Sequence, residues 1–522
     1  MTRLPSPELI DQACELAAEL LSAQRTPVEE KEATKMSRLL ADPAGKELTF
    51  HLADEVFRPP GAKAQASTFR RLVRTHGIPK YLRPHERFLM LLGSFASRFL
   101  PSVVMPAVTA QIRKDSQRVI LAREEKPLNE YFAKRSKVNL NLLGEAILGE
   151  EEARNRLEQN LELLAKPECH YLSVKISAIF SQINLLDQEG TLTAIQERLR
   201  RLYRTGKFIN LDMEEYRDLD LTCEAFKRTL DEPEFQDLEA GIVLQAYLPD
   251  SFHALQDLTA WAKTRKAPIK IRIVKGANLA MEKVEASQHH WPQAPYDDKT
   301  DVDANYKRLL HFAMEPNNTA AVRIGVASHN LFDIAYALLL REQNGVQDRV
   351  ELEMLEGMAN EHARALDAKG SPVLFYAPIV KKENFHSAIA YLVRRLDENT
   401  SPENFLAHVF SMKPGDEAFK EQEARFRESC ARIPTVKAGP NRTQDRDLPT
   451  PPMGVEFQNS PETDWVLPAN REWLDKAIVS YTPDAPPVLA DLAGVKAALE
   501  TASNSQWSET TPQERAKLLH RA

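Results

Sequence analysis

Eight short runs rich in β-branched and aliphatic residues recur between residues 138 and 380, and most are separated by helical stretches. The runs are VNLNLLGEAI, YLSVKISAI, FINLDME, GIVLQAYL, IKIRIVKGA, VRIGVAS, VELEMLEGM and VLFYAPIV. Intervals such as LTAIQERLRRLYRTG have the spacing of an amphipathic helix. Eight strands alternating with helices over roughly 285 residues predict an α/β fold, a (β/α)8 TIM-type barrel. A doubly wound sheet is the competing fold, but its GxGxxG signature is absent from the chain.

The chain outside the barrel divides into three further segments. Residues 1–135 show helical spacing, as in IDQACELAAELL and RFLMLLGSFASRFL, and contain no convincing strand, so we expect a helical arm before a barrel at 136–420. Residues 421–470 are rich in proline and polar residues and predict a linker. Helical spacing resumes over residues 471–522, and the chain stops within its last helical stretch, which suggests a missing continuation.

Composition excludes several classes of protein. The 68 basic and 75 acidic residues give a net charge of -7, which offers no electrostatic case for wrapping nucleic acid. The four cysteines are far apart, which argues against a disulfide framework, and no metal site is expected. The N-terminus lacks a signal peptide, and no run of about 18 apolar residues occurs. These features predict a soluble cytoplasmic protein and leave attachment to a membrane surface open.

Polar residues late in each run are candidates for a site, because ligands of such barrels bind at the carboxyl ends of the strands. Lys175 in YLSVKISAI has apolar neighbours, and the two-residue period of a strand would direct it into the barrel, where an ammonium needs an anion. The residues in the same place in other runs are Asp212, Gln245, Arg272, Lys275, His329, Asn330 and Glu356. Each alone is compatible with a structural network, but their recurrence favours a ligand site.

Two adjacent arginines interrupt the helical spacing of YLVRRLDEN, which follows the last run. Neighbours on a helix point about 100° apart, so Arg394 and Arg395 cannot both lie on one solvated face that also keeps Leu392 and Leu396 buried. Either one is structural and the other solvated, or the pair forks around an anion. The cations Lys175, Arg272, Lys275, Arg394 and Arg395 outnumber the acids Asp212, Glu356 and Glu398. This predicts a positive surplus at the barrel mouth and an anionic ligand, either a carboxylate or a phosphate.

With these residues laid out, the chain resembles the proline dehydrogenase part of the bifunctional proline utilization A family. The matching pieces are NLLGEA, SVKISA, NLDMEE, VLQAYLPDS, RIVKGANLAMEKVEA, TDVDANYKRLL, GVASHN, LEGMA, YAPIV and YLVRRLDENTSPENF. The segment from FQNSPETDW to ERAKLLHRA is similar to the entrance of the family's NAD-dependent aldehyde dehydrogenase half. Its nucleophilic cysteine and NAD-binding region would lie beyond Ala522, so we expect a fragment or truncated form that cannot oxidise glutamate semialdehyde.

The resemblance implies roles for individual residues. A lysine and two helix arginines clamp the proline carboxylate in the family, and they correspond to Lys175, Arg394 and Arg395. The residues implied to line the rest of the substrate pocket are Asn278, Leu355, Tyr376 and Tyr391. The implied FAD contacts are Asp212, Gln245, Arg272, Lys275, Gly276, Ala277, His329, Asn330, Glu398 and Phe405. Lys175, Asp212 and Arg272 would be the catalytic residues, with Arg272 nearest the reactive flavin nitrogen.

The chain departs from the family pattern at two places. Several relatives carry VKGAYW where this sequence has VKGANL, so Asn278 replaces an aromatic residue, which puts discrimination between proline and hydroxyproline in doubt. Longer relatives begin with a ribbon-helix-helix domain, and this chain shows no basic strand-helix-helix at its start, so no DNA binding is expected.

The resemblance implies oxidation of L-proline to Δ1-pyrroline-5-carboxylate by hydride transfer to FAD, the first step of proline catabolism. A membrane quinone would accept the electrons, which implies peripheral contact with the inner face of the membrane, and the full-length protein would be a homodimer. Two alternatives remain: an inactive barrel that serves as a scaffold, and a flavin-free barrel that uses Lys175 as a Schiff base.

Overall fold

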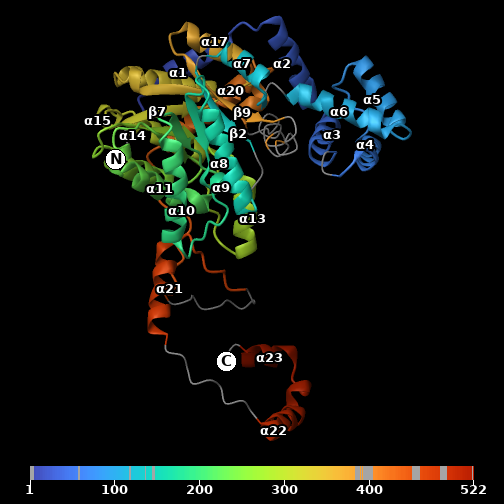
Figure 1. Ribbon diagram of the computed structural model, residues 1–522, viewed down its shortest axis with the longest axis vertical. Helices are drawn as coiled ribbons and strands as arrows, with labels where there is room; N and C mark the ends of the chain where they lie inside the picture. Colours follow the sequence, from blue (N-terminus) through green and yellow to red (C-terminus); the bar gives the residue numbers. More distant parts are fainter. Residues whose placement is uncertain are drawn as a thin grey trace. The chain divides into compact units, whose positions relative to one another are not determined.

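The computed structural model describes residues 5–522 except 57–58, 117–118, 136, 144–146, 382–387, 389–390, 392–403, 449–458, 482–490, 520 and 522. The larger of its two compact units contains a closed barrel of eight parallel strands (Figure 1). The strands are β2 (Val138–Leu142), β3 (Tyr171–Val174), β4 (Phe208–Leu211), β5 (Gly241–Gln245), β6 (Ile269–Val274), β7 (Val322–Ala327), β8 (Val350–Leu355) and β9 (Val373–Val380). Each pairs with the next along the chain, and β9 closes the barrel on β2, with Val138 opposite Phe375. The predicted TIM-type barrel is confirmed.

A short additional strand extends the sheet beside β9. Strand β1 (Leu121–Ala122) pairs in parallel with β9 and places Leu121 opposite Ile379, and helix α7 (Glu125–Phe132) follows it. The expectation that residues 1–135 contain no strand is therefore wrong at this point, because a strand of two residues is too short to show a period of two.

Helices follow the strands and cover the outside of the barrel. The main ones are α8 (Glu150–Leu164), α10 (Gln188–Tyr203), α11 (Leu219–Leu230), α12 (Ser251–Ala262), α14 (Lys299–Ala313), α16 (Leu331–Gln343) and α17 (Asn360–Ala368). The further elements of this part of the chain are α9 (Ile176–Ile179), η1 (Tyr216–Asp218), η2 (Pro233–Phe235), α13 (Leu279–His289), α15 (Pro316–Thr319), η3 (Gln347–Arg349) and α19 (Phe405–Val409). In α10, Ile195, Leu199 and Leu202 follow the 3.6-residue period and are fully buried against the barrel.

One helix that precedes the barrel strands in the sequence and one that follows them complete this core. Helix α1 (Pro7–Leu21) starts at the N-cap Ser6, whose side chain accepts a hydrogen bond from the Leu9 amide, and it packs on α16. Helix α20 (Glu417–Arg432) packs on α14 and buries Phe419 and Phe426. The predicted linker start at residue 421 is therefore wrong, because few apolar residues among many charges suffice to dock α20.

A second, smaller hydrophobic core lies within the N-terminal arm. It is formed by helices α3 (Pro43–Glu55), α4 (Ala62–His76), α5 (Pro84–Ala96) and α6 (Pro101–Ser116), which follow α2 (Pro27–Leu40). Leu48, Phe69, Leu72 and Met105 are its most buried large side chains. We call these four helices the α3–α6 group.

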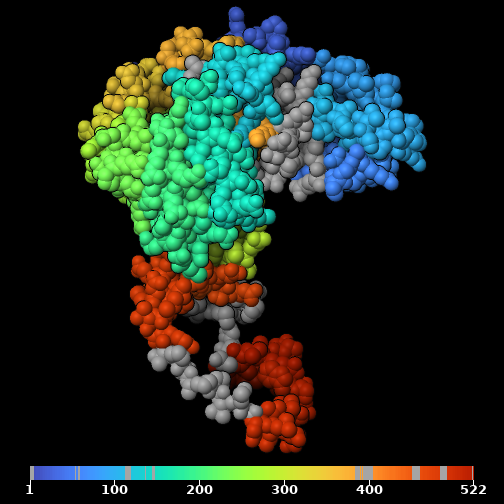
Figure 2. Space-filling view, viewed as in Figure 1, coloured from blue at the N-terminus to red at the C-terminus, as the bar shows by residue number. Residues whose placement is uncertain are grey.

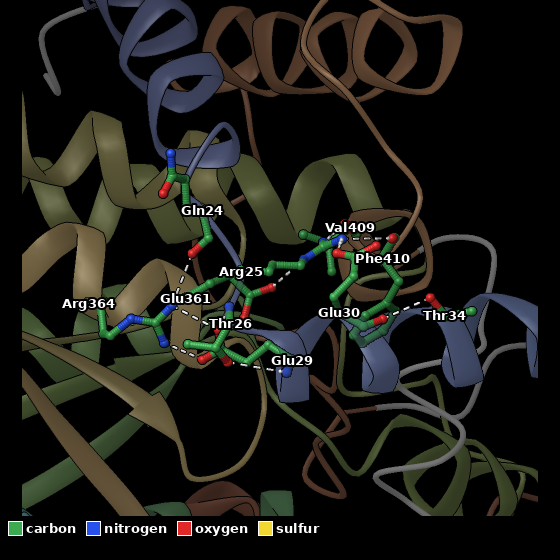
Figure 3. A network of polar contacts seen from close by, with 10 residues as sticks. All are labelled: Gln24, Arg25, Thr26, Glu29, Glu30, Thr34, Glu361, Arg364, Val409 and Phe410. Carbon is green, nitrogen blue, oxygen red and sulfur yellow. Dashed lines mark hydrogen bonds and ion pairs between the residues drawn. The ribbon is translucent and has the colours of Figure 1, made fainter.

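The turn between α1 and α2 is tied to the barrel by a network of polar contacts (Figure 3). Arg25 binds Glu361 of α17 at 3.1 Å and donates to the carbonyl oxygens of Val409 and Phe410. Arg364 of α17 pairs with Glu29 and donates to the Gln24 carbonyl oxygen at 3.0 Å. Charged side chains therefore hold the start of the arm against the helix that follows β8.

Residues 445–449 and 468–522 form a second unit. Its helical elements are α21 (Pro468–Ser480), α22 (Leu492–Ser503), η5 (Gln506–Glu509) and α23 (Pro512–Leu519), so the predicted helical segments are present. Within this unit the Asn470 side chain accepts from the Arg446 amide at 3.0 Å, and Lys476 pairs with Asp447 at 2.7 Å. None of the helices in the described parts of the chain has the length and hydropathy needed to cross a membrane.

Candidate active site

A column of alternating charges fills the barrel interior. Lys137, just before β2, lies 3.1 Å from Glu351 on β8, and Glu351 lies 2.7 Å from Lys270 on β6. Lys270 also lies 2.6 Å from Glu353, whose other oxygen lies 2.7 Å from Arg272 Nε. Side chains two residues apart on a strand share a face, so β6 supplies both inner cations and β8 both acids. We call these five residues the charge column.

The column ends at Asp212, which directly follows β4 at the carboxyl end of the barrel. Arg272 Nη1 lies 3.8 Å from Asp212 Oδ1. Tyr376 Oη donates to Asp212 Oδ2 at 2.8 Å, and Asn210 Nδ2 donates to Oδ1 at 2.9 Å. The Arg272 guanidinium lies over the Tyr376 ring, 4.7 Å from its centroid. Predicted site residues from three strands, Asp212, Arg272 and Tyr376, therefore lie together at the mouth.

Burial is the largest influence on the ionisation of this cluster. It raises the pKa of Asp212, and the Arg272 guanidinium offsets only part of that rise. Burial opposes the charge of Arg272, but the Glu353 and Asp212 carboxylates outweigh burial and raise its pKa. The mouth therefore holds a permanent cation beside a carboxyl group that takes up a proton more readily than usual.

Lys175 directly follows β3 and pairs with an acid from the next loop. Its ammonium lies 2.7 Å from Glu214 Oε1, and the two side chains are 30% and 28% exposed. The anion that Lys175 requires is therefore Glu214, which the sequence analysis did not name. Partial exposure leaves the ammonium accessible to a ligand carboxylate, which would compete with Glu214 for it.

Lys275, at the carboxyl end of β6, lies inside a group of charges. Its ammonium lies 2.6 Å from both Asp303 of α14 and Asp333 of α16. Lys299 contacts Asp303 at 2.7 Å, and Lys307 contacts Asp333 at 3.0 Å. Burial opposes the charge on Lys275, but the two carboxylates raise its pKa overall. A contact between this ammonium and a cofactor phosphate, as predicted, would require it to leave two carboxylates.

The backbone after Lys275 makes a tight turn. Gly276 has φ of +115°, and a Cβ at this position would lie 2.5 Å from the Tyr247 ring. Ala277 is exposed, whereas Asn278 is buried at the N-cap position of α13, where its side chain makes no capping hydrogen bond. Only glycine fits at position 276, since both the positive φ and the nearby ring exclude a side chain.

The predicted residues after β7 have partners of their own. His329 Nε2 accepts a hydrogen bond from the Leu355 amide at 3.0 Å, so a neutral ring carries its hydrogen on Nδ1. Asn330 caps α16 by accepting from the Phe332 amide at 3.0 Å. Both residues therefore shape the loops around the mouth.

Glu356, after β8, is held by the segment that precedes the barrel. Tyr131 Oη donates to Glu356 Oε2 at 2.6 Å, and Arg135 Nη2 lies 3.2 Å from Oε1. Arg135 also donates to Asn360 at 3.1 Å. Residues 131–135 therefore contact the mouth of the barrel directly, although the sequence analysis assigned them to the arm.

The remaining predicted residues follow β9. Tyr391 is partly buried and packs against a small cluster that includes Val380. Phe405 begins α19 and is buried. Arg394, Arg395 and Glu398 lie outside the described residues.

Four acids that the sequence analysis did not count neutralise the cations of the mouth. They are Glu214, Asp303, Asp333 and Glu353. Lys175, Arg272 and Lys275 each have a carboxylate within 2.7 Å, so the predicted positive surplus is not found in the described part of the mouth. The sequence contained a signal for Glu353: the two glutamates of VELEML are two residues apart in a predicted strand, so both side chains lie on the same face.

The fold and the site define a class of protein: a TIM-barrel enzyme whose polar and ionised groups meet at the carboxyl ends of the strands. The profile of the proline dehydrogenase family matches residues 125–408, more than half of the chain. The chain belongs to the proline dehydrogenase family, and its barrel is a proline dehydrogenase domain of the oxidoreductase class. The match begins at residue 125, which agrees with the contacts of α7 rather than with the predicted boundary at 136.

Individual relatives agree with this assignment. The chain is 29% identical over 283 residues to the proline dehydrogenase of Deinococcus radiodurans, covering 53% of this chain and 82% of that protein. It is 26% identical to the bifunctional protein PutA of Escherichia coli over 73% of this chain, but spans only 32% of that protein.

Solved structures give the same fold. Proline utilization A from Corynebacterium freiburgense is 42% identical with a TM-score of 0.65, covering 76% of this chain and 40% of that one. The Bdellovibrio bacteriovorus protein, solved after inactivation by N-propargylglycine, is 26% identical with a TM-score of 0.71, covering 90% and 48%. The chain therefore spans less than half the length of these bifunctional relatives.

Proposed function

We propose that this chain oxidises L-proline to Δ1-pyrroline-5-carboxylate with FAD as the cofactor. The observation that carries the proposal is the convergence of Lys175, Arg272, Asp212 and Tyr376 at the carboxyl end of a barrel of this family. Proline loses two electrons and two protons in the reaction, and bound FAD supplies the hydride acceptor.

The residues present fit a flavin. Gln245 supplies an amide and Arg272 a buried guanidinium at the ends of neighbouring strands, and both can donate to the carbonyl or phosphate oxygens of FAD. Gly276 leaves the backbone after β6 free of a side chain, so a planar ring system can approach it closely. Of the other predicted FAD contacts, Ala277 lies in the same turn, and His329, Asn330, Glu398 and Phe405 remain predictions.

The substrate carboxylate would be held by Lys175 with Arg394 and Arg395, which together present a fork of donors. Binding would exchange the Lys175–Glu214 pair for a pair with the ligand, so the ammonium is never left without an anion. Tyr376, fixed by its hydrogen bond to Asp212, would form one wall of the pocket, with Leu355, Tyr391 and Asn278 as the other predicted walls. The residues position the substrate and exclude water, which is the protein's main contribution to such a reaction.

The permanent cation at Arg272 would stabilise negative charge that develops beside it during the reaction. Glu353 and Asp212 hold this guanidinium from two sides. A quinone of the membrane is the proposed electron acceptor, and a homodimer is the proposed assembly of the full-length protein.

The visible absorption spectrum of the purified chain, recorded before and after L-proline is added without oxygen, tests the proposal. Oxidised flavin peaks that bleach with proline would support cofactor and substrate together. A colourless protein that takes up no added FAD would contradict the proposal and favour a scaffold. Trapping of a carbonyl substrate on Lys175 by borohydride would favour the Schiff-base alternative.

Variants separate substrate binding from flavin binding. We expect Arg395→Met and Lys175→Met to weaken proline binding by about tenfold to a hundredfold while the flavin stays bound, because each removes one charged hydrogen bond to the carboxylate. The matched control is Arg323→Met. Arg323 is half-exposed, pairs with Glu239 and lies at the amino end of β7, away from the barrel mouth, so this variant should bind proline as the wild type does. Unaltered proline binding in both site variants would contradict the carboxylate clamp.

A further inference from the structure

The loop between β8 and α17 has a backbone conformation that is costly for one of its residues. Gly357 and Ala359 in this loop have φ of +78° and +82°. Ala359 is one of two non-glycine residues with a positive φ in the described part of the chain, and its Cβ makes this left-handed region unfavourable. We call residues 355–360 the β8 loop. A conformation of this kind persists only where surrounding contacts hold it.

Glu356 is the residue through which the β8 loop is held. It is buried, and its carboxylate accepts from the Tyr131 hydroxyl at 2.6 Å, from Arg135 Nη2 at 3.2 Å and from the Gly357 amide of its own loop at 3.2 Å. Burial, and then the Glu356 carboxylate, raise the pKa of Tyr131, so this hydroxyl keeps its proton and remains a donor. The buried carboxylate therefore depends on two side chains that precede the barrel in the sequence.

Arg135 connects the two ends of the β8 loop. Its guanidinium contacts Glu356 near the start of the loop and donates to the Asn360 side chain at 3.1 Å at the end. It also lies over the Phe375 ring of β9, 3.9 Å from the ring centroid, which fixes its position. Figure 2, viewed as in Figure 1, shows the cyan segment that contains α7 and the amber segment that contains α17 at the same end of the barrel. Helix α7 and the residues after it therefore support this loop from the side of β9.

The β8 loop carries one predicted wall of the substrate pocket and is bonded to another. Leu355 is its first residue, and the Leu355 amide donates to His329 at 3.0 Å. The Glu356 amide donates to the Tyr376 carbonyl oxygen at 2.9 Å, and the Tyr376 hydroxyl in turn binds Asp212. A shift of the loop would therefore move Leu355 and disturb Tyr376 at the mouth.

We propose that Tyr131 and Arg135 are positioning residues for the substrate pocket, which they hold in shape through Glu356 and the β8 loop. The inference rests on the proposed function, in which Leu355 and Tyr376 line that pocket. Tyr131 and Arg135 act without touching the substrate or the flavin, because they raise the fraction of molecules in which the loop is in place for binding. Their loss should weaken substrate binding and leave the chemical step unchanged.

Steady-state kinetics of the flavin-loaded chain, with proline as substrate and a dye as electron acceptor, tests the proposal. Tyr131→Phe and Arg135→Gln should each raise KM by about threefold to tenfold and leave kcat within about twofold of the wild type. Tyr81→Phe is the matched control for the tyrosine, because it removes a hydrogen-bonded hydroxyl within the α3–α6 group. Arg204→Gln is the control for the arginine, because it removes a guanidinium with two hydrogen bonds at the end of α10 that leads into β4. Both controls should keep the KM of the wild type.

Hydrogen exchange of the whole chain gives a measurement that needs neither flavin nor turnover. Peptides that cover residues 355–360 should exchange their amide hydrogens at least about tenfold faster in Tyr131→Phe than in the wild type or in Tyr81→Phe. Adding Ala359→Gly to Tyr131→Phe should lower the raised KM by about threefold, because glycine adopts the left-handed conformation without the cost that alanine incurs.

Variants that lose thermal stability but keep the KM of the wild type would overturn the proposal, since Tyr131 and Arg135 would then be structural only. A raised KM that Ala359→Gly does not lower would contradict control through the conformation of the loop. If Arg135→Gln does not fold, Tyr131→Phe, which keeps its ring, still decides between these outcomes. A wild type whose flavin is not bleached by proline contradicts the proposed function itself, so the wild type alone tells the two failures apart.

Discussion

The interior of the barrel and the apolar face of α5 depart in opposite directions from the usual distribution of side chains in a folded protein. The barrel encloses charge: Glu353 is fully buried, and Lys270 and Arg272 beside it are almost so. The apolar face of α5 consists of four large side chains that are each more than half exposed: Phe88, Leu91, Leu92 and Phe95. Lys270, Arg272 and Glu353 each have an opposite charge within 2.7 Å, so these interior charges are satisfied by the chain itself. The exposed apolar side chains of α5 are not covered by any described element, which indicates a partner outside the chain.

Breaking the charge column should produce the largest effect. Glu353→Gln would leave Lys270 and Arg272 buried with one fewer negative charge, and we expect a loss of about 3–5 kcal/mol in the free energy of unfolding. Lys137→Gln removes a cation at the half-exposed end of the same column and should cost at most about 1 kcal/mol. Denaturant unfolding of both variants measures the difference. Equal losses would show that burial does not set the strength of these pairs.

Asp218 is a buried acid without a close cation, so removing its charge should stabilise the protein, unlike removing the paired charge of Glu353. Asp218 is 5% exposed, and its Oδ1 atom has no hydrogen-bond partner among the described residues. Burial, and then the charge of Glu215, raise its pKa from 3.8 to about 7. The raised pKa means that Asp218 keeps its proton in the folded state up to about pH 7, so stability falls as pH rises from about 4 through about 7.

Asp218→Asn should therefore stabilise the protein by about 2–4 kcal/mol at pH 8, where the wild type must ionise this buried group. The difference should vanish near pH 4, where both side chains are neutral. Thermal unfolding across this pH range measures it, with Asp237→Asn, at an exposed aspartate, as the control. A constant difference at all pH values would mean that packing, and not ionisation, separates the two proteins.

The order of the strands followed from the sequence because local patterns determine it. Each strand is a short β-branched run, and the helices between them show the 3.6-residue period. Eight such repeats predict one closed architecture, the (β/α)8 barrel. The two exceptions are short or sparsely apolar: β1 has two residues, and α20 docks through few side chains such as Phe426. Such elements form because the barrel already provides the surface on which they pair or pack.

The site was less predictable because its ion pairs join distant parts of the chain. The position of Lys175 at the end of β3 was readable from its strand, but its partner Glu214 belongs to the next loop. Asp303 and Asp333 lie within helices, where an acid usually faces solvent, and only the packing of α14 and α16 turns both toward Lys275. The sequence showed which strands end in charge and could not show how those charges pair.

An ion pair of intermediate exposure should have an effect between the two extremes. Glu29 is tied to Arg364, whose hydrogen bonds are the main reason that the pKa of Glu29 falls from 4.5 to about 2. A lowered pKa contributes stability that is complete above pH 4.5 and is lost as pH falls toward 2. Glu29→Gln should cost about 1 kcal/mol at pH 7, since Arg364 is nearly half exposed, and the difference should shrink below pH 4.5.

The control for this pair is Glu30→Gln, because Glu30 is 64% exposed and lies 3.8 Å from Arg25. It should leave the free energy of unfolding within about 0.5 kcal/mol of the wild type. A loss for Glu30→Gln as large as that for Glu29→Gln would argue that general surface charge, and not the contact with α17, holds the arm in place.

The smallest effect on stability should come from the apolar face itself. Leu92→Ser replaces a side chain of α5 that is 51% exposed, so we expect the free energy of unfolding to change by no more than about 0.5 kcal/mol. Leu72→Ala, in the small core beneath α5, removes a side chain that is 1% exposed and should cost about 2–5 kcal/mol. Denaturant unfolding of the arm, followed by a probe attached within the α3–α6 group, compares the two. If Leu92→Ser destabilises the arm as much as Leu72→Ala does, the apolar face is packed against the chain in solution, and the contrast between a satisfied interior and an unsatisfied surface would disappear.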